Sequence, residues 1–248
     1  MKNNLLKPNE RLEDLQCKNL VLIQKPDNYC FTTDSVLLAN FVKCKPSEKV
    51  IELCSGSGVI SMLLCVKNNL KHIDMVEIQN DLFDMSKRSV EYNNLQDKIF
   101  AHNMPLQIAS KTLGSEIYDI VVSNPPYYKI VGAQTNESEN RSIARHEIEM
   151  NLSDLVVETK KLLKYGGKAY FIHRADRIDE IINELINNNL NPKILQFIQP
   201  KPDKESHLVL VQAIKGGKSG VRVLPMLYLN NEDDSINEKV AKIYNQNV

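Results

Sequence analysis

The sequence predicts an α/β fold in which a mixed, mostly parallel sheet of seven strands carries helices on both faces. Three observations support it. Apolar strand-like segments alternate with helix-like segments between residues 49 and 123. A glycine-rich turn follows the first of these strands. The last two strand-like segments have no helix between them, which predicts an antiparallel C-terminal edge.

The elements are predicted in this order. A short helix at residues 34–42 follows Thr32 and Thr33, which are residue types that begin helices. The predicted strands are residues 49–54, 72–78, 98–102, 117–123, 168–173, 193–199 and 207–214. The further predicted helices are residues 59–67, 81–94, 152–163, 175–188 and one near 237–244. We expect one domain overall, a core at residues 46–248 on which residues 1–45 pack as an N-terminal segment and lead-in helix.

Composition narrows the class of protein. The chain has 248 residues, of which 42% are apolar and 25% charged, so we expect an ordinary folded core. Residues 1–11 are polar, and no apolar run has the roughly 18 residues that a membrane span needs. We therefore expect a cytoplasmic protein. The five cysteines are scattered without a CxxC pair, which argues against a disulfide framework and against a metal site.

Charge gives a weaker indication. The net charge is zero, so it supplies no overall argument for binding nucleic acid. Residues 160–222, however, hold twelve Lys or Arg against six Asp or Glu. Either this segment has an ordinary solvated surface or it presents a phosphate-contacting face.

The turn at residues 52–58 (ELCSGSG) is the first candidate binding element. In a parallel sheet, ligands bind beyond the carboxyl ends of the strands, and glycines there let a ligand approach the backbone. Glu77 follows Gly58 by 19 residues and ends the second strand, where a carboxylate can accept both hydroxyls of a ribose. A structural turn with an exposed carboxylate is the simpler alternative. A nicotinamide-binding unit is disfavoured because Ser61 replaces the third glycine of GxGxxG.

The second candidate is Asn124-Pro125-Pro126-Tyr127, directly after the fourth strand, where two prolines end regular structure. The Asn124 side-chain oxygen and the Pro125 carbonyl can accept the two hydrogens of an exocyclic amino group such as adenine N6. They would hold that poor nucleophile in line with a methyl donor. Tyr127 can stack on an extruded base. A Pro-Pro turn with packing tyrosines is the alternative.

With residues 31–38 (FTTDSVLL), 124–128 (NPPYY) and 144–147 (ARHE), the chain resembles the class I amino-methyltransferases with an Asn-Pro-Pro-Tyr motif over nearly its whole length. More narrowly, it is similar to the bacterial tRNA1(Val) (adenine-37-N6)-methyltransferase family. The resemblance implies a class I methyltransferase Rossmann-like fold, S-adenosyl-L-methionine as cofactor and adenine N6 of tRNA as the methylated group. Apart from the resemblance, the segment 129–151 is polar, lacks clear periodicity and is too long for a simple connector, so we expect a lid or a substrate loop there.

The resemblance completes the predicted site. The catalytic set is Asn124, Pro125, Pro126 and Tyr127. The cofactor-binding set is Thr33, Glu52, Cys54, Ser55, Gly56, Gly58, Glu77, Ile78, Asn103, Met104 and Asn124. The substrate-binding set is Phe31, Tyr127, Tyr128, Arg145 and His146. For residues 32–34 a helix-start signal, and for residues 145–147 a salt-bridged surface turn, are equally good interpretations.

Two positions depart from the family pattern. Cys54 stands at the usual first glycine of the cofactor loop, so we expect a backbone conformation there that is open to non-glycine residues. Asn103 stands where many relatives have an Asp, although its amide oxygen can still accept a hydrogen bond.

Alternative functions stay open. They are adenine N6 methylation of ribosomal RNA or DNA, glutamine N5 methylation of a release factor, and RNA binding without catalysis. We expect a monomer.

Overall fold

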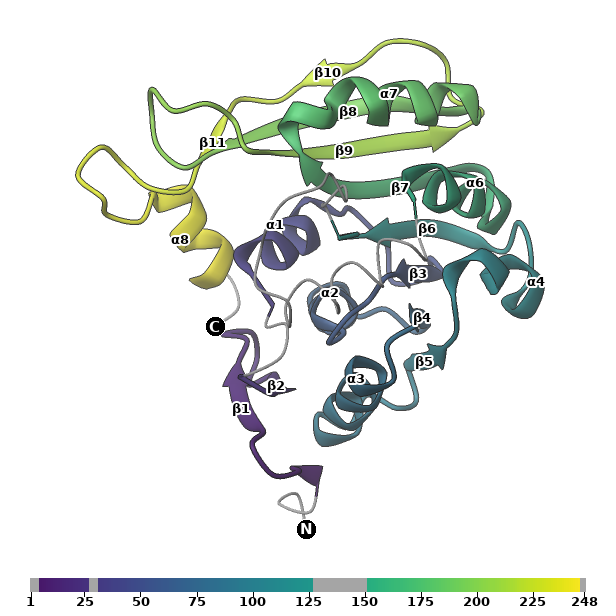
Figure 1. The fold of residues 1–248 in the computed structure, drawn as a ribbon, viewed down its shortest axis with the longest axis vertical. Helices are drawn as coiled ribbons and strands as arrows, with labels where there is room; N and C mark the ends of the chain where they lie inside the picture. The colour runs from purple at the N-terminus through teal and green to yellow at the C-terminus, as the bar shows by residue number, and fades with distance from the viewer. Residues whose placement is uncertain (1–4, 27–30, 127–150, 246–248) are drawn as a thin grey trace, which may run out of the picture.

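The computed structural model describes residues 5–26, 31–126 and 151–245, and a large mixed sheet forms its centre (Figure 1). The strands of this sheet are β3 (Val50–Leu53), β4 (Ile73–Glu77), β5 (Ile99–Asn103), β6 (Tyr118–Ser123), β7 (Leu163–Arg174), β8 (Leu190–Gln199), β9 (Leu208–Lys215), β10 (Arg222–Val223) and β11 (Leu227–Tyr228). Their order is β10-β8-β9-β7-β6-β3-β4-β5, and β11 also pairs with β8. The seven predicted strands are β3 to β9, which confirms a mixed sheet flanked by helices, but β10 and β11 bring the sheet to nine strands rather than seven.

The helices alternate with the strands as predicted. They are α1 (Thr33–Phe41), α2 (Val59–Asn68), α3 (Asn80–Tyr92), α4 (Ala109–Leu113), α6 (Leu152–Leu162), α7 (Ile178–Asn187) and α8 (Glu238–Asn245), with short 3₁₀ turns at Leu106–Ile108 and Ala175–Arg177. None of these helices is long and apolar enough to cross a membrane.

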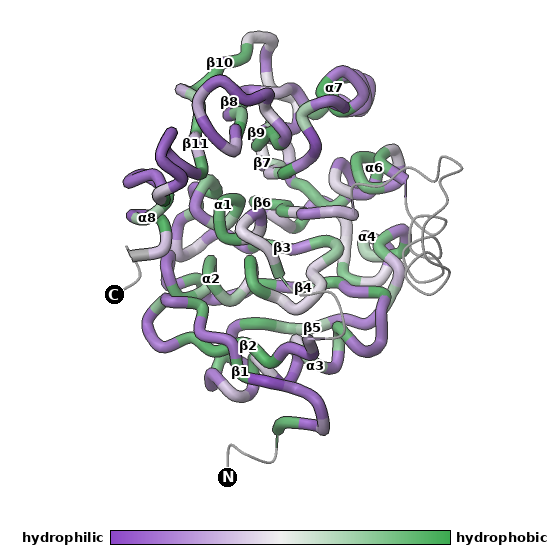
Figure 2. The backbone as a smooth tube through the Cα atoms, turned by 60° about the vertical axis from the view of Figure 1, so that its left-hand side comes forward, coloured by the Kyte–Doolittle hydropathy of each residue, from purple (hydrophilic) through white to green (hydrophobic). Residues whose placement is uncertain are grey.

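Two layers of buried side chains cover the two faces of the sheet. One layer joins α1, α2 and α8 to strand residues such as Val50 and Ile120, whereas the other joins α6 and α7 to Ile51 and Val121. Successive residues of one strand thus serve opposite layers, as the period of two requires. Figure 2 shows the apolar segments gathered in the middle of the molecule and polar ones around its periphery.

The prediction of an antiparallel strand from the C-terminal part of the chain is confirmed, but its placement at the edge of the sheet is wrong, because β8 and then β10 lie outside β9. Strand β9 is antiparallel to both neighbours, β7 and β8. The short strands β10 and β11 then pair parallel with the outer side of β8. The sequence did not indicate these two strands because each has only two residues.

An N-terminal hairpin of β1 (Arg11–Asp14) and β2 (Val21–Gln24) precedes α1, and the sequence did not indicate it. It packs on α3, where the Asn93 side chain bonds both backbone groups of Val21 and the Ser89 hydroxyl accepts the N–H of Ile23. Its turn contains Gln16, Lys18 and Asn19 at positive φ, with no glycine to mark it.

Candidate active site

The carboxyl ends of four parallel strands bring the predicted site residues to one edge of the sheet. Leu53 of β3 pairs with Val76 of β4 on one side and with Ser123 of β6 on the other. Glu77 of β4 pairs with Asn103 of β5. Because neighbouring strands lie about 4.8 Å apart, Asn124, the loop at 54–58, Glu77 and Asn103 follow one another along this edge.

The loop after β3 depends on its glycines. Gly58 has φ 81° and begins α2, and a Cβ there would meet the Met75 sulfur at 3.1 Å and the Ser86 Cβ at 3.4 Å. Gly56 has φ 53°, with no atom within 4 Å of where its Cβ would lie. Glycine at 58 therefore permits close packing on β4 and α3, whereas Gly56 leaves open space beside the backbone.

The expectation for Cys54 is wrong. Its φ is 57°, in the left-handed region that non-glycine residues seldom adopt. The strand must turn sharply here, because the next N–H, that of Ser55, bonds the carbonyl of Val76 at 3.0 Å. The family's glycine would meet this requirement without steric cost, so Cys54 keeps the turn at the expense of local strain.

Glu77 holds two loops together at the end of β4. One carboxylate oxygen accepts the N–H of Gly56 at 2.7 Å, and the other accepts the N–H of Gln79 at 2.9 Å. The side chain is buried. Each carboxylate oxygen has a second lone pair, so Glu77 can shape the loop and still accept a ligand's hydroxyls.

Glu52 lies on β3, just before the loop, and bonds to α2. Its carboxyl accepts both the N–H of Ser61 at 2.9 Å and the Ser61 hydroxyl at 2.5 Å, and it is 1% exposed. Burial raises the pKa of Glu52 to about 8, although the bonds from Ser61 oppose the shift and the nearby Glu77 charge adds to it. Glu52 therefore fixes the first turn of α2 to β3 and is mostly neutral at pH 7.

Other predicted cofactor residues surround the same edge. The Ser55 hydroxyl is buried and has no hydrogen-bond partner among the described residues. The Asn103 amide nitrogen donates to the carbonyls of Glu77 and Ile78, at 2.9 and 3.2 Å, which leaves its oxygen as the acceptor end. Ile78 is exposed and the N–H of Met104 bonds the Glu77 carbonyl. An unpaired buried hydroxyl is a group that a bound ligand can satisfy.

Asn124 follows β6 and contacts α1. Its amide nitrogen donates to the Ser35 hydroxyl at 3.2 Å. The preceding residue, Ser123, donates its hydroxyl to the carbonyl of Leu53 at 2.7 Å, which fixes the end of β6 to β3. Pro125 is buried and Pro126 is exposed. Sequence reasoning missed Ser35 as a site residue, since only its place in the segment 31–38 drew attention to it.

The start of α1 is held from its other side by the C-terminal helix. The Tyr244 hydroxyl of α8 donates to the Thr33 hydroxyl at 3.1 Å, and Phe31 packs against the core layer that contains α1 and α2. Thr33 is therefore engaged by α8, next to the turn of helix that carries Ser35. Tyr127, Tyr128, Arg145 and His146 lie outside the described residues.

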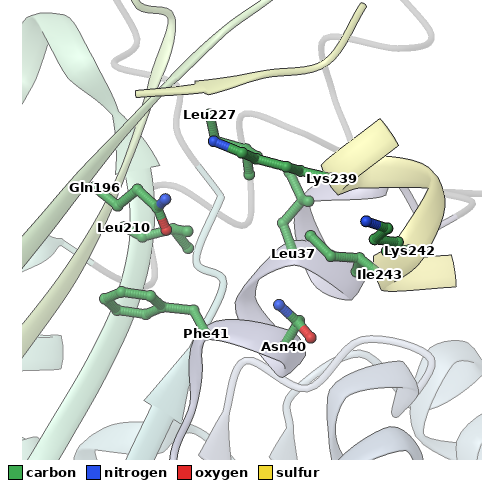
Figure 3. Close-up of a pocket in the computed structure, with 9 residues that line it drawn as sticks. All are labelled: Leu37, Asn40, Phe41, Gln196, Leu210, Leu227, Lys239, Lys242 and Ile243. Carbon is green, nitrogen blue, oxygen red and sulfur yellow. The ribbon is translucent and has the colours of Figure 1, made fainter. Parts of the chain in front are cut away.

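A hollow of about 310 Å³ beside α1 is separate from this edge (Figure 3). It lies between α1, the strands β8 and β9, and α8, and none of the predicted site residues lines it. Its lining residues are Leu37, Asn40, Phe41, Gln196, Leu210, Leu227, Lys239, Lys242 and Ile243. The polar side chains of the hollow are amides and lysines only, whereas carboxylate, hydroxyl and amide groups converge at the strand ends.

The basic segment 160–222 is largely neutralised within the chain. Within the described residues, seven of its cations pair with carboxylates. Four of these carboxylates lie more than 30 residues from their partner in the sequence. The pairs are Lys161–Glu158, Lys164–Asp119, Lys168–Glu48, Arg174–Asp176, Arg177–Glu180, Lys201–Asp234 and Lys215–Glu116. This pairing favours a solvated surface over a phosphate-contacting face.

The resemblance predicts this arrangement: a glycine loop, a strand-end carboxylate and an Asn-Pro-Pro turn on adjacent parallel strands. Comparison with known families shows which family the chain belongs to. The family model described as "Methyltransferase small domain" matches residues 31–189, which is more than half of the chain. The chain belongs to the methyltransferase small domain family. The matched range runs from the start of α1 to the end of α7 and so contains the whole strand edge described above.

Two relatives of similar sequence carry the same name. The chain is 22% identical over 204 residues to a tRNA1(Val) (adenine(37)-N6)-methyltransferase of Dyadobacter fermentans, covering 81% of this chain and 82% of that protein. It is 24% identical over 185 residues to the protein of the same name in Aeromonas hydrophila, covering 74% and 76%.

Solved structures share the fold. A predicted O-methyltransferase from Agrobacterium tumefaciens superimposes with a TM-score of 0.71 at 18% identity, covering 87% of this chain and 97% of that one. A geranyl diphosphate C-methyltransferase from Streptomyces coelicolor, crystallised with S-adenosyl-L-homocysteine, gives a TM-score of 0.54 at 12% identity, covering 72% and 75%. The predicted methyltransferase Rossmann-like fold is confirmed.

Proposed function

We propose that this chain transfers a methyl group from S-adenosyl-L-methionine to adenine N6 in tRNA, at adenine 37 of tRNA1(Val). The observation that carries the proposal is the placement of Asn124 one strand away from the glycine loop and two from Glu77, on a single edge of the sheet. This placement would put an acceptor for an amino group beside a nucleoside-binding crevice. The names of the relatives from Dyadobacter and Aeromonas support the choice of substrate.

The residues present fit the cofactor. The unpaired Ser55 hydroxyl and the open space at Gly56 suit the polar methionine end. The Glu77 carboxylate suits the two ribose hydroxyls, and the Asn103 oxygen suits a donor on the adenine. When bound, S-adenosyl-L-methionine supplies an electrophilic sulfonium methyl group.

The residues of the chain would prepare the acceptor nitrogen. Adenine N6 is a poor nucleophile because its lone pair is delocalised into the ring. The Asn124 oxygen and the Pro125 carbonyl would accept its two hydrogens, which favours a tetrahedral nitrogen whose lone pair is free to react. The Asn124 amide nitrogen already bonds Ser35, so the opposite end of the amide, its oxygen, is the acceptor. The N6 proton is released to solvent after transfer.

The test uses total tRNA from a strain that lacks this gene. Purified protein and radiolabelled S-adenosyl-L-methionine should place label in N6-methyladenosine of the tRNA, and sequencing of the labelled species should give adenine 37. Such a substrate would place the protein in the cytoplasm. Label in ribosomal RNA, DNA or a release factor would keep the methyl transfer and overturn the substrate. Binding of tRNA without methyl transfer would overturn the activity.

A further inference from the structure

A second, smaller hollow lies where the last turns of α1 and α2 meet. Its volume is about 170 Å³. The residues that line it come from the end of α1, the segment after it and the end of α2: Ala39, Asn40, Val42, Lys43, Cys44, Lys67 and Asn68. None of these lining residues is acidic, and two of the seven are lysines.

Lys67 is the notable member of this lining. Its ammonium nitrogen is buried and has no hydrogen-bond partner among the described residues. Burial lowers the pKa of Lys67, and the positive charge of Lys43 lowers it further, while the Cys17 thiol opposes the shift. A buried ammonium group without an acceptor is costly, so natural proteins pair such groups or give them a bound counterion.

The usual structural explanation for a lysine at a helix end does not account for Lys67. Cations near helix C-termini commonly bond the last free carbonyls. Here Lys18 takes that position, since its ammonium bonds the Val66 carbonyl at 3.4 Å. The neighbouring carbonyls of Leu64 and Cys65 accept from Asn68 and Leu70. Lys67 itself reaches no carbonyl within hydrogen-bond distance in the described part of the chain.

Glu48, a carboxylate close enough to act on the lining residue Cys44, is engaged elsewhere. Glu48 accepts the N–H of Lys45 at 2.6 Å and pairs with Lys168 at 3.5 Å. Lys43 makes one long bond, to the Asn40 carbonyl at 3.3 Å. The hollow is therefore lined by two lysine side chains and no carboxylate, and it has room for a small ligand.

We propose that this hollow binds a phosphoryl oxyanion, held by Lys67 and Lys43. Tetrahedral oxyanions present several acceptor oxygens to converging ammonium groups, which is the chemistry that the lining offers. The phosphoryl group comes from one of two sources, free phosphate or a backbone phosphate of bound RNA. The second source rests on the proposed function, whereas the first does not.

The first experiment is calorimetric titration of the full chain with inorganic phosphate at constant ionic strength. The wild type should bind saturably, and Lys67→Met should lose this binding because Met keeps the length of the side chain without its charge. Lys87→Met is the matched control, since Lys87 is exposed on α3 and lines neither hollow. It should bind phosphate as the wild type does.

Thermal unfolding checks that the variant is folded. Without phosphate, Lys67→Met should melt at or above the wild-type temperature, because it removes a buried unpaired charge. With phosphate, only the wild type and the control should gain stability. Absence of phosphate binding by the wild type, or equal binding by Lys67→Met, would overturn the proposal.

The second experiment identifies the source. If RNA supplies the phosphoryl group, Lys67→Met should weaken tRNA binding severalfold and reduce the salt slope by about one, relative to Lys87→Met. Unchanged tRNA binding together with lost phosphate binding would assign the site to free phosphate. The phosphate titration involves no methyl transfer. Phosphate binding can therefore be found where the proposed function fails, and methyl transfer can be found where phosphate binding fails.

Discussion

The two ends of strand β4 each bury a carboxylate, and different kinds of donor surround them. Near the start of the strand, Asp74 lies 2.7 Å from Nε2 of both His72 and His102 and accepts the Tyr118 hydroxyl at 2.8 Å. At the end of the strand, Glu77 accepts the backbone N–H groups of Gly56 and Gln79. Side chains from β5 and β6 thus enclose Asp74, whereas loop backbone supports Glu77.

Under the proposed function, this difference separates a stabilising carboxylate from one that would bind a ligand. Burial alone would raise the pKa of Asp74, but the hydrogen bonds from His102, Tyr118 and His72 outweigh it and lower that pKa to about 2. Asp74 therefore ties β4 to β5 and, across β3, to β6 as a charged group. Glu77 lies at the strand edge where we propose that the cofactor binds, and its carboxylate holds two loop N–H groups. We expect substitutions at the two ends of β4 to affect different measurements.

The largest effect should follow loss of the amino-group acceptor at the ligand edge. Asn124→Ala should lower kcat for tRNA methylation by about 100- to 1000-fold, since it removes a preorganised group that acts on the reacting nitrogen. Cofactor affinity should stay within severalfold, as measured by calorimetry. An equal loss of cofactor affinity would contradict the role assigned to Asn124.

Asp74→Ala should act on stability alone. Removing a buried carboxylate with several charged and polar partners should lower the free energy of unfolding by about 3 kcal/mol. Urea denaturation measures this loss, and kcat of the folded variant should be unchanged. Asp176→Ala, at an exposed carboxylate paired with Arg174, is the control and should change stability little.

The same substitution tests the charge of Asp74 through pH. Its folded pKa lies below the ordinary value of 3.8, so its contribution is present above that pH and is lost as pH falls towards 2. Asp74→Ala should therefore flatten the fall of stability in this window. An unchanged acid profile would mean that Asp74 is not held as an anion.

Glu77→Ala should weaken cofactor binding by roughly 1 to 3 kcal/mol, because it removes acceptors from both the ribose and the loop. Glu77→Gln keeps the shape and one acceptor oxygen, so it should lose less. Cofactor affinity that is unchanged in Glu77→Ala would place the ligand elsewhere and remove the contrast with Asp74.

The smallest expected effect is that of Ser35→Ala. Loss of the hydroxyl removes one bond that orients the Asn124 amide and should raise the activation free energy of methyl transfer by about 0.5 to 1.5 kcal/mol, with KM for the cofactor nearly unchanged. Ser35→Thr keeps the hydroxyl and should restore most of the activity. Equal kcat in the wild type and Ser35→Ala would show that Asn124 is positioned without Ser35.

The sequence predicts local features better than distant partnerships. The spacing of apolar residues and the glycine turns predict β3 to β9. Because the strands that carry them are parallel, Glu77 and Asn124 lie at a common edge. Neither the bond from Asn124 to Ser35 nor the group around Asp74 was predicted, because each joins residues from separate elements. The left-handed turn at Cys54 was mispredicted because residue type alone does not reveal a backbone angle that the fold imposes.

The position of β9 between β7 and β8 affects the order in which the strands can pair during synthesis. Strands β3 to β7 lie side by side and can pair as the ribosome delivers them, but β8 is made before the strand that connects it to β7. Until residues 208–215 emerge, β8 has no neighbour in the sheet and β7 keeps an open edge. A nascent chain stalled before residue 208 would therefore present the unpaired strand β8 and the open edge of β7 to any chaperone or to another copy of itself.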